Sequence, residues 1–219
     1  ALAGKSLAGT RRHGKHLFAR ADGGPWVEMH FGMTGYLLYR RNLDDLPGGA
    51  RLDLELAGGW HLLFLCPRKL GHLSLVGDPE EFIAREGLGP DALAIDRSEW
   101  DGLVRGARGG LKSLLMDQER LAGVGNVYSD EILLRAGLHP RTPAGKLDGE
   151  ARARLHRALR EVLAEAIEAR ADPADMPSTF LLPHREEGAP CPRCGGEIER
   201  VRVGGRSAYV CPACQGEGE

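Results

Sequence analysis

Four cysteines near the C-terminus constrain the fold of this chain more than any other feature. They form two CxxC pairs, Cys191 with Cys194 and Cys211 with Cys214, separated by residues 195–210. Two such pairs supply four thiolates, which suit a tetrahedral Zn²⁺, although paired disulfides or a redox CxxC can share this spacing. Four protein ligands leave no open coordination position. We therefore expect one Zn²⁺ with a structural role.

The residues between the cysteine pairs predict a β-hairpin. Gly204 and Gly205 separate two strand-like runs, ERVRV and RSAYV, and a two-residue glycine turn is a hairpin signal. Arg206 follows the turn directly and so lies at the tip of the hairpin. One interpretation is an ordinary solvated arginine. The other is a phosphate contact, because the guanidinium group matches the geometry of phosphate oxygens.

The first third of the chain predicts antiparallel β structure. Residues 51–56 read RLDLEL and alternate charged with apolar side chains, which is typical of a half-buried strand. Residues 60–65 read WHLLFL and follow a glycine turn, so the two runs predict a hairpin. Residues 6–20 and 26–40 are further strand candidates. We expect Cys66, just after the hairpin, to be a small buried side chain.

The middle of the chain predicts helices. DPEEFIAREG begins with an aspartate cap and a proline at the first helical position, and DRSEWDGLVRGA predicts a second short helix. The longest predicted helix begins near Gly149 and carries an apolar stripe that faces a core. The stripe consists of Leu155, Leu159, Val162, Leu163, Ala166 and Ile167.

These patterns predict an α+β chain with four parts. An antiparallel β-sandwich covers residues 1–76, and a helical domain covers residues 77–172. A proline-containing linker covers residues 173–190, and the zinc finger covers residues 191–215.

Two glycines and an asparagine lie between two predicted helices of the middle region. Gly123 and Gly125 allow φ > 0 and close approach of another backbone, and Asn126 is a good cap for a helix that begins at Val127. A helix N-terminus with exposed N–H groups binds anions. The alternative is a simple turn between two helices, in which the glycines serve only to form the turn.

Charge and composition exclude several classes of protein. No apolar run approaches the roughly 18 residues of a membrane span, and no secretory signal pattern is present. The net charge of −2 excludes a chain that is basic throughout, but residues 1–20 carry five Lys or Arg and no acid. Lys15 lies in this basic segment. By residue type alone, Lys15 is an ordinary solvated lysine and Met33 an ordinary core residue.

Several segments together resemble the bacterial family of formamidopyrimidine-DNA glycosylase and endonuclease VIII, and more closely its formamidopyrimidine branch. LMDQERLAGVGNVYSDEILLRAGLHP resembles the family's helix–two-turn–helix, here within residues 111–137, and CPRCGGEIERVRVGGRSAYVCPACQ resembles its zinc finger. RRHGKHL, HFGMTG and PRKLG follow the order of its N-terminal β-sandwich.

The resemblance implies roles for individual residues. Asn126 would contact a DNA phosphate, and Arg206 would hold the phosphate of the damaged nucleotide and take part in δ-elimination. Lys15 would take part in β-elimination and contact the backbone. Met33 would fill the gap left by the flipped base, and Arg68 would pair with the orphaned base opposite.

The resemblance also bears on three further positions. Leu70 stands where the formamidopyrimidine enzymes typically have a wedging phenylalanine. Lys112 matches a lysine near the damage pocket, and Arg108 adds to the same basic rim. The family's mature N-terminus begins with Pro-Glu, the nucleophile and the acid, whereas this chain begins with Ala-Leu, so the resemblance implies an incomplete N-terminal domain without the catalytic start.

The resulting hypothesis is a base-excision repair DNA glycosylase with AP lyase activity. It would act on oxidised or ring-opened bases in double-stranded DNA, as a monomer in the bacterial cytoplasm, associated with the nucleoid and not with a membrane. Two alternatives stay open. One is a non-catalytic protein that binds damaged, distorted or abasic DNA, and the other is a zinc-ribbon and two-helix assembly that binds RNA or the transcription or translation apparatus.

Overall fold

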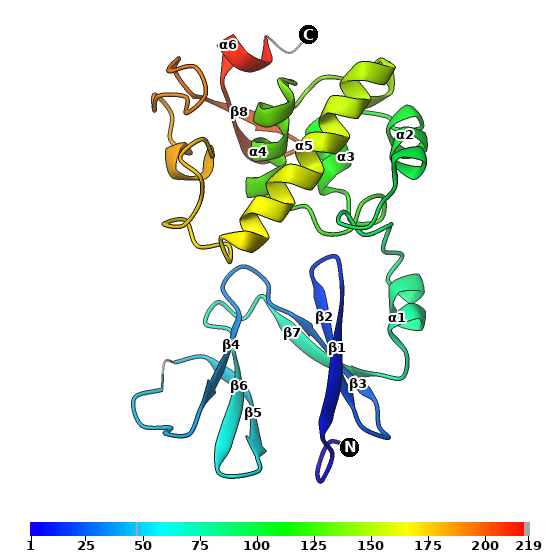
Figure 1. Cartoon of the computed structure of the whole chain (residues 1–219), viewed down its shortest axis with the longest axis vertical. Helices are drawn as coiled ribbons and strands as arrows, with labels where there is room; N and C mark the ends of the chain where they lie inside the picture. Colours follow the sequence, from blue (N-terminus) through cyan, green and yellow to red (C-terminus); the bar gives the residue numbers. More distant parts are fainter. Residues whose placement is uncertain (47, 217–219) are drawn as a thin grey trace. The chain divides into compact units, whose positions relative to one another are not determined.

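The computed structural model describes residues 1–46 and 48–216. The chain divides into two compact units, Ala1–Gly87 and Leu88–Glu219. The first unit contains the large β-sheets, and the second contains most of the helices together with a small β-hairpin (Figure 1). None of the helices in the described part of the chain is long and apolar enough to span a membrane.

The first unit contains two antiparallel sheets. The four-stranded sheet has the order β1-β2-β3-β7, and the three-stranded sheet has the order β4-β6-β5. The strands are β1 (Leu7–His13), β2 (His16–Ala21), β3 (Trp26–His30), β4 (Tyr36–Arg40), β5 (Ala50–Leu56), β6 (Trp60–Leu65) and β7 (His72–Val76).

The two sheets pack through one face each to form a sandwich. Val27 and Met29 of β3 and Phe64 of β6 are buried in its core, as is Cys66, which confirms the expectation for that cysteine. The hairpin predicted over residues 51–65 is confirmed as β5 and β6.

The stretch over residues 6–20, expected as one strand candidate, is two strands. β1 and β2 reverse direction at Gly14 and Lys15, where Gly14 has φ 55°. This left-handed conformation suits glycine and the tight turn of a hairpin, and it explains why the chain turns here.

Helix α1 (Pro79–Arg85) belongs to the first unit. Asp78 caps it by accepting hydrogen bonds from the N–H groups of Glu80 and Glu81, as its sequence predicts. Phe82 packs edge-on against Phe18 of β2, so α1 covers the face of the four-stranded sheet that points away from the sandwich core. The boundary between the compact units therefore follows this helix, later than the boundary expected at residue 76.

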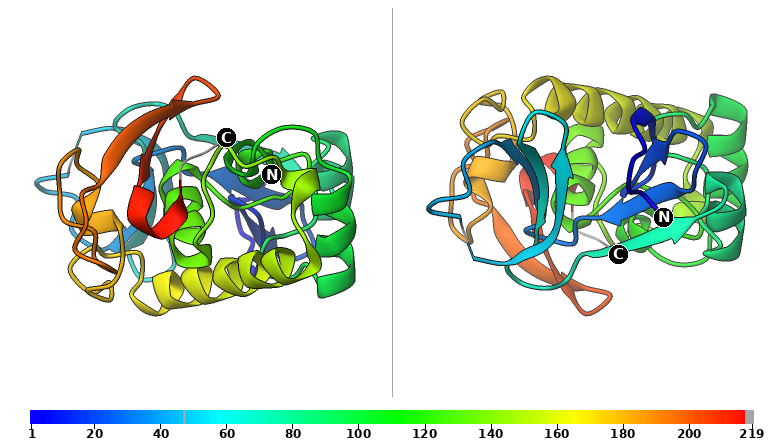
Figure 2. Two further views of the ribbon diagram at one scale, coloured as in Figure 1. Left: turned by 90° about the horizontal axis from the view of Figure 1, so that it is seen from above. Right: turned by 90° about the horizontal axis from the view of Figure 1, so that it is seen from below.

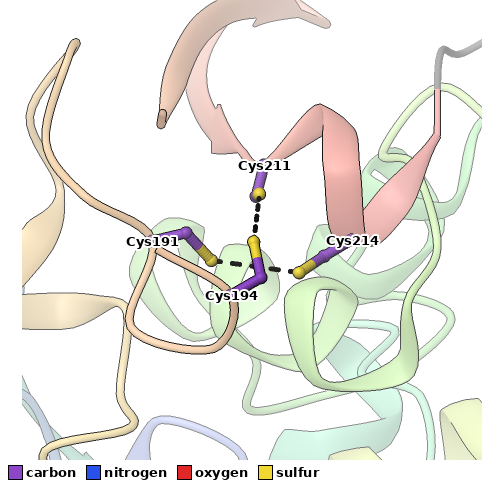
Figure 3. A group of neighbouring side chains, drawn as sticks. All are labelled: Cys191, Cys194, Cys211 and Cys214. Atoms are coloured by element: carbon purple, nitrogen blue, oxygen red, sulfur yellow. Dashed lines mark hydrogen bonds between the residues drawn. The ribbon is translucent and has the colours of Figure 1, made fainter. Parts of the chain in front are cut away.

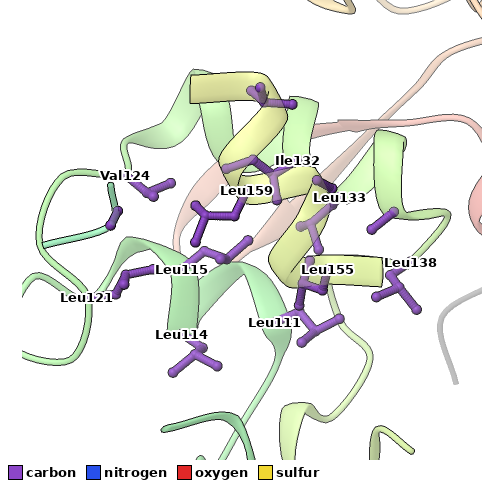
Figure 4. Packing of buried hydrophobic residues seen from close by; sticks show 14 of the residues in the cluster. Leu111, Leu114, Leu115, Leu121, Val124, Ile132, Leu133, Leu138, Leu155 and Leu159 are labelled. Atoms are coloured by element: carbon purple, nitrogen blue, oxygen red, sulfur yellow. The ribbon is translucent and has the colours of Figure 1, made fainter. Parts of the chain in front are cut away.

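The second unit is built around its longest helix. Its helices are α2 (Arg97–Arg105), α3 (Leu111–Met116), α4 (Asn126–Ala136), η1 (Ala144–Lys146), α5 (Gly149–Glu168), η2 (Leu182–His184) and α6 (Pro212–Gln215). Leucines from α3, Ile132 and Leu133 from α4, and Leu155 and Leu159 from α5 interlock in one buried core (Figure 4).

The apolar stripe of α5 is confirmed except at its C-terminal end. Leu155, Leu159, Val162 and Ala166 are buried, whereas Ile167 is 60% exposed. At 100° per residue Ile167 lies about 120° around the helix from Leu155, outside the face that packs on α4.

The segment expected as a linker contains little regular structure, but it is anchored to the helices. Phe180 and Leu181 are fully buried, the first in the helical core and the second beside two of the finger's cysteines. After it, β8 (Glu199–Val203) and β9 (Arg206–Val210) form the expected hairpin, a ribbon that ends in a tight loop (Figure 2). The α+β class, with antiparallel sheets, a helical region and a cysteine-bounded hairpin, is thus confirmed.

Candidate nucleic-acid interface and zinc centre

The four cysteines of the finger converge on one point. Cys191 and Cys194 come from the loop before β8, whereas Cys211 directly follows β9 as the N-cap of α6 and Cys214 lies within α6 (Figure 3). The sulfur atoms lie 3.9 Å apart between Cys191 and Cys214 and 3.4 Å apart between Cys194 and Cys211. Four sulfurs bound tetrahedrally at 2.3 Å from Zn²⁺ would be about 3.8 Å apart. The arrangement therefore fits zinc.

The thiols of the finger differ in environment. The backbone N–H of Gly196 donates to the sulfur of Cys194, and this bond is the main reason why the pKa of Cys194 is lowered to about 7. Burial raises the pKa of Cys211. Because Zn²⁺ binds thiolates, its binding is coupled to deprotonation of these thiols.

Gln215 connects the finger to the helix–two-turn–helix. Its side-chain oxygen accepts from the backbone N–H of Cys211 at 2.9 Å, and its amide nitrogen donates to the carbonyl of Leu138 at 2.9 Å. Ile198 packs with Leu134 of α4 in the small core beneath the cysteines. The finger is consequently held on α4 by both polar and apolar contacts.

Arg206 lies at the tip of the finger hairpin, as expected. Gly204 and Gly205 have φ 56° and 78°, so the turn uses the left-handed conformation twice. Arg206 is exposed and borders a pocket of about 400 Å³ between the hairpin turn and α3. The pocket is lined by Lys112, Ser113, Met116, Asp117, Gln118, Glu119, Val203, Gly204 and Arg206.

The junction between α3 and α4 differs from the sequence-based expectation in two details. Gly123 has φ 123°, but Gly125 is extended, with φ −116°. Gly125, and not Asn126, is the N-cap of α4, so no side chain caps the helix. Asn126 occupies the first helical position, and its buried side-chain oxygen has no hydrogen-bond partner. The N-terminal N–H groups of α4 are therefore not closed off by a side-chain cap.

Gln118 holds this junction in shape, a role that the sequence analysis missed. Its amide nitrogen donates to the carbonyls of Met116 and Val124 at 2.9 Å, and its oxygen accepts from the N–H of Gly123 at 3.0 Å. One side chain thus satisfies three backbone groups of the two-turn segment. A glutamine within MDQER was the only sequence signal for this role.

Lys112 does not extend onto an exposed basic rim, contrary to expectation. It is 1% exposed, and its ammonium group is paired with Asp130 and hydrogen-bonded to the hydroxyl of Ser129 at 2.9 Å. Burial lowers the pKa of Lys112, while Asp130 acts in the opposite direction. The reason is geometric, because Lys112 is on the face of α3 that packs on α4.

Asp130 is shared between three segments of the second unit. Besides Lys112, it accepts from the guanidinium of Arg185 at 2.7 Å and from the backbone N–H of Tyr209 at 3.3 Å. Arg185 also stacks over the Tyr209 ring, 4.7 Å from its centroid. The carboxylate therefore links α3, the segment before the finger and β9.

Three of the expected DNA-facing residues lie on two adjoining loops of the first unit. Met33 follows β3 and is 72% exposed, so the alternative of an ordinary core residue is wrong. Arg68 and Leu70 follow β6 and are exposed as well. A Cβ atom on Gly32 would lie 2.7 Å from the backbone carbon of Leu70, and one on Gly71 would lie 2.5 Å from the carbonyl oxygen of His30. Glycine at both positions lets the loops touch.

The two remaining basic positions are exposed. Lys15 lies in the turn between β1 and β2, not within a strand, and Arg108 lies in the loop between α2 and α3. In the first unit, Gly32 of the loop that carries Met33 lies against the backbone of Leu70, whereas Lys112 and Arg206 border one pocket in the other unit.

Comparison with known proteins settles the family. Formamidopyrimidine-DNA glycosylase of Thermus thermophilus is 41% identical over 98% of this chain and 84% of its own length. The chain belongs to the formamidopyrimidine-DNA glycosylase family. Residues 1–73 match the family's N-terminal domain, residues 88–177 its H2TH domain, and residues 188–216 a zinc finger found in FPG and IleRS. The glycosylase of Alkalilimnicola ehrlichii is 36% identical over the same share of this chain.

Solved structures of this family share the fold. The Lactococcus lactis enzyme, bound non-covalently to DNA containing an AP site, matches with a TM-score of 0.86 at 26% identity, covering 98% of this chain and 83% of that one. A MutM complex with carbocyclic 8-oxo-G containing DNA matches with the same score, identity and coverage. The resemblance inferred from the five sequence segments is thereby confirmed.

Proposed function

We propose that this protein acts in base-excision repair as a DNA glycosylase with AP lyase activity, on oxidised or ring-opened bases in double-stranded DNA. Membership of the family supports the class of enzyme, and related structures hold lesion-containing or abasic DNA. The proposed residue roles rest on the geometry of each unit.

The display of apolar side chains on two locked loops is the observation that carries the proposal. Met33 and Leu70 are 72% and 52% exposed. Exposure of large apolar side chains to water is unfavourable for the free protein, and such exposed apolar surface marks interaction sites. An enzyme that extrudes a nucleotide must fill the space left in the duplex, and apolar wedges between bases do so. We assign this role to Met33 and Leu70, and assign to Arg68 the pairing with the base opposite the lesion.

Backbone contacts are proposed for the second unit. The uncapped N-terminus of α4 offers N–H groups and a positive dipole end to a phosphate, and Asn126 adjoins it. Arg206 offers a guanidinium fork from the hairpin tip. Such contacts position the protein without reading sequence, which suits an enzyme that searches all DNA.

The other basic residues have two kinds of role in this proposal. Lys15, exposed at a hairpin tip, takes part in β-elimination, and Arg108 contacts the DNA backbone. Lys112 acts indirectly, since its pairing with Asp130 positions the α3–α4 junction. We also propose a single structural Zn²⁺ in the finger, a monomer, and a cytoplasmic location at the nucleoid.

A salt titration of DNA binding tests the phosphate contact. The full chain should bind a duplex with one abasic-site analogue more tightly than the undamaged duplex, and Arg206→Ala should reduce the slope of log K against log salt by about one. Arg202→Ala is the matched control because Arg202 is exposed on the same hairpin but faces the opposite side of the ribbon. An unchanged slope for Arg206→Ala would remove Arg206 from the phosphate contacts.

Borohydride trapping on the same abasic duplex tests the lyase chemistry. An amine that attacks the sugar C1′ forms a Schiff base, which borohydride reduces to a stable covalent bond. A covalent band that is lost in Lys15→Ala would identify the lysine as the attacking amine. Lesion-selective binding without any covalent band would show that this chain recognises damage but lacks the nucleophile.

A further inference from the structure

The outer face of the four-stranded sheet carries an unusual group of polar residues. In the register of the sheet, His16 of β2, His30 of β3 and His72 of β7 are direct cross-strand neighbours. Glu28 lies two residues before His30 and therefore on the same face. Directly opposite Glu28 on β7 is Ser74. Three imidazoles and one carboxylate thus meet on three adjacent strands.

Glu28 is the centre of this group. Its side chain is 0% exposed, and one carboxylate oxygen lies 2.8 Å from Nδ1 of His16. The other oxygen accepts from the Ser74 hydroxyl at 2.8 Å and lies 3.5 Å from Nε2 of His72. The last distance is long for a hydrogen bond, so His72 approaches the carboxylate without completing a contact.

We propose that His16, Glu28 and His72 form a second metal site, specific for a divalent transition ion of the Zn²⁺ class. Two imidazoles and one carboxylate are a donor set that zinc sites use. One ligand atom from each residue lies within 4.8 Å of the others, whereas atoms bound tetrahedrally to zinc are about 3.4 Å apart. His72 is 56% exposed and is the residue that rotates to close this gap.

The fourth coordination position in this site is open. His30 is close enough to be considered, since its ring stacks on that of His72 with centroids 5.3 Å apart. However, Nδ1 of His30 accepts from the backbone N–H of Gly32 at 3.2 Å. In the neutral ring the proton is then on Nε2, which cannot bind a metal. Three protein ligands with an open position reached from the side of His72 distinguish this site from the closed site of the finger.

Neighbouring residues orient the ligands. Ser74 donates to the Glu28 oxygen on the His72 side, and Phe82 of α1 packs against the His16 ring with centroids 5.3 Å apart. Such contacts fix the rotamers of metal ligands before the ion arrives. The site is thus built on rigid strands and covered on one side by a helix.

Cobalt substitution of the whole 219-residue chain tests the proposal. The finger is first saturated with Zn²⁺, and Co²⁺ is then titrated in. Occupancy of the second site gives weak visible absorption without the strong thiolate-to-cobalt bands that a cysteine site produces. We expect one equivalent of Co²⁺ to bind in this way, and total Zn²⁺ measured after zinc saturation and desalting to be two ions per chain.

His72→Ala is the decisive variant, because an exposed side chain can be removed with little risk to folding. It should lose the visible absorption and retain one zinc per chain. His61→Ala is the matched control, since His61 pairs with Asp53 at 2.9 Å on the other sheet and should keep both signals. Glu28→Gln should behave as His72→Ala does. A wild-type chain that binds one ion only, or a His72→Ala chain that still binds two, would overturn the proposal.

Discussion

Among the residues that the structure describes, each unit buries one glutamate, and the environments of the two shift the carboxyl pKa in opposite directions. Glu28 in the sheet unit is 0% exposed, and Glu131 on α4 in the helical unit is 2% exposed. Burial by itself raises the pKa of Glu28, but hydrogen bonds from His16 and Ser74 outweigh it and lower the pKa. Burial dominates at Glu131 and raises its pKa to about 7, although the N–H of Leu181 donates to it at 2.6 Å.

The difference shows how each unit uses buried charge. In the sheet unit, side chains on neighbouring strands satisfy the carboxylate of Glu28. In the helical unit, Asp130 and Glu131 attach segments that are distant in sequence, including Arg185 and Leu181. Buried carboxylates therefore join distant segments in the helical unit, whereas the buried carboxylate of the sheet unit joins neighbouring strands.

Loss of the finger's metal should have the largest effect. Zinc contributes about 10–16 kcal/mol of apparent binding free energy in finger peptides, and that energy is folding energy. Cys194→Ser removes a ligand whose side chain is exposed and contributes little to packing. We expect the finger to unfold and binding to abasic DNA to be lost while most of the helical circular dichroism remains. Retained DNA binding in zinc-depleted Cys194→Ser protein would show that the finger is dispensable.

Asp130→Ala should have the next largest effect. It leaves the buried Lys112 and the Arg185 guanidinium without their shared carboxylate, which typically costs about 3–5 kcal/mol. Urea unfolding measures this loss, and the fluorescence of the fully buried Trp100 reports on the helical unit when Trp26 and Trp60 are replaced by Phe.

A double variant separates the charge effect from lost packing. Lys112→Met combined with Asp130→Leu removes both charges of the closest pair and should recover the part of the loss that comes from the buried Lys112, while Arg185 stays without its carboxylate. A loss below about 1 kcal/mol for Asp130→Ala would mean that Asp130 contributes little to holding the segment before the finger.

Glu131 should make the stability of the helical unit depend on pH. Between the ordinary pKa of 4.5 and the raised value of about 7, the folded state keeps a proton that the unfolded state has lost. Stability therefore falls as pH rises through this window, by about 3 kcal/mol in total. Glu131→Gln should remove this dependence. The prediction would be contradicted if the free energy of unfolding changed with pH in the same way for both proteins between pH 5 and 8.

Much of the fold could be predicted from local sequence patterns. The cap at Asp78, the α5 stripe and the β5–β6 hairpin depend on neighbouring residues and period, and the structure contains all three. The cysteine pairs predicted the finger because their chemistry requires the sulfurs to converge.

The site was less predictable because its partners are distant in sequence. Burial of Lys112 depends on Asp130, eighteen positions later, and on Arg185, which comes from a segment expected to be a linker. Asn126 is a good cap by residue type, but Gly125 takes the cap position, directly after a turn whose Gly123 N–H is bound by the distant Gln118 side chain. Neither periodicity nor local motif contains this information.

Met33→Ala should have the smallest effect on stability and still a measurable effect on function. A side chain that is 72% exposed contributes little to folding, so the free energy of unfolding should change by less than about 0.5 kcal/mol. Affinity for abasic-site DNA should fall about tenfold, or about 1.4 kcal/mol, because the space in the duplex is no longer filled. Leu75→Ala is the control, since Leu75 is 53% exposed on β7 but lies outside both loops. Equal affinity losses in the two variants would mean that exposed apolar surface in general, and not the loop carrying Met33, contributes to binding.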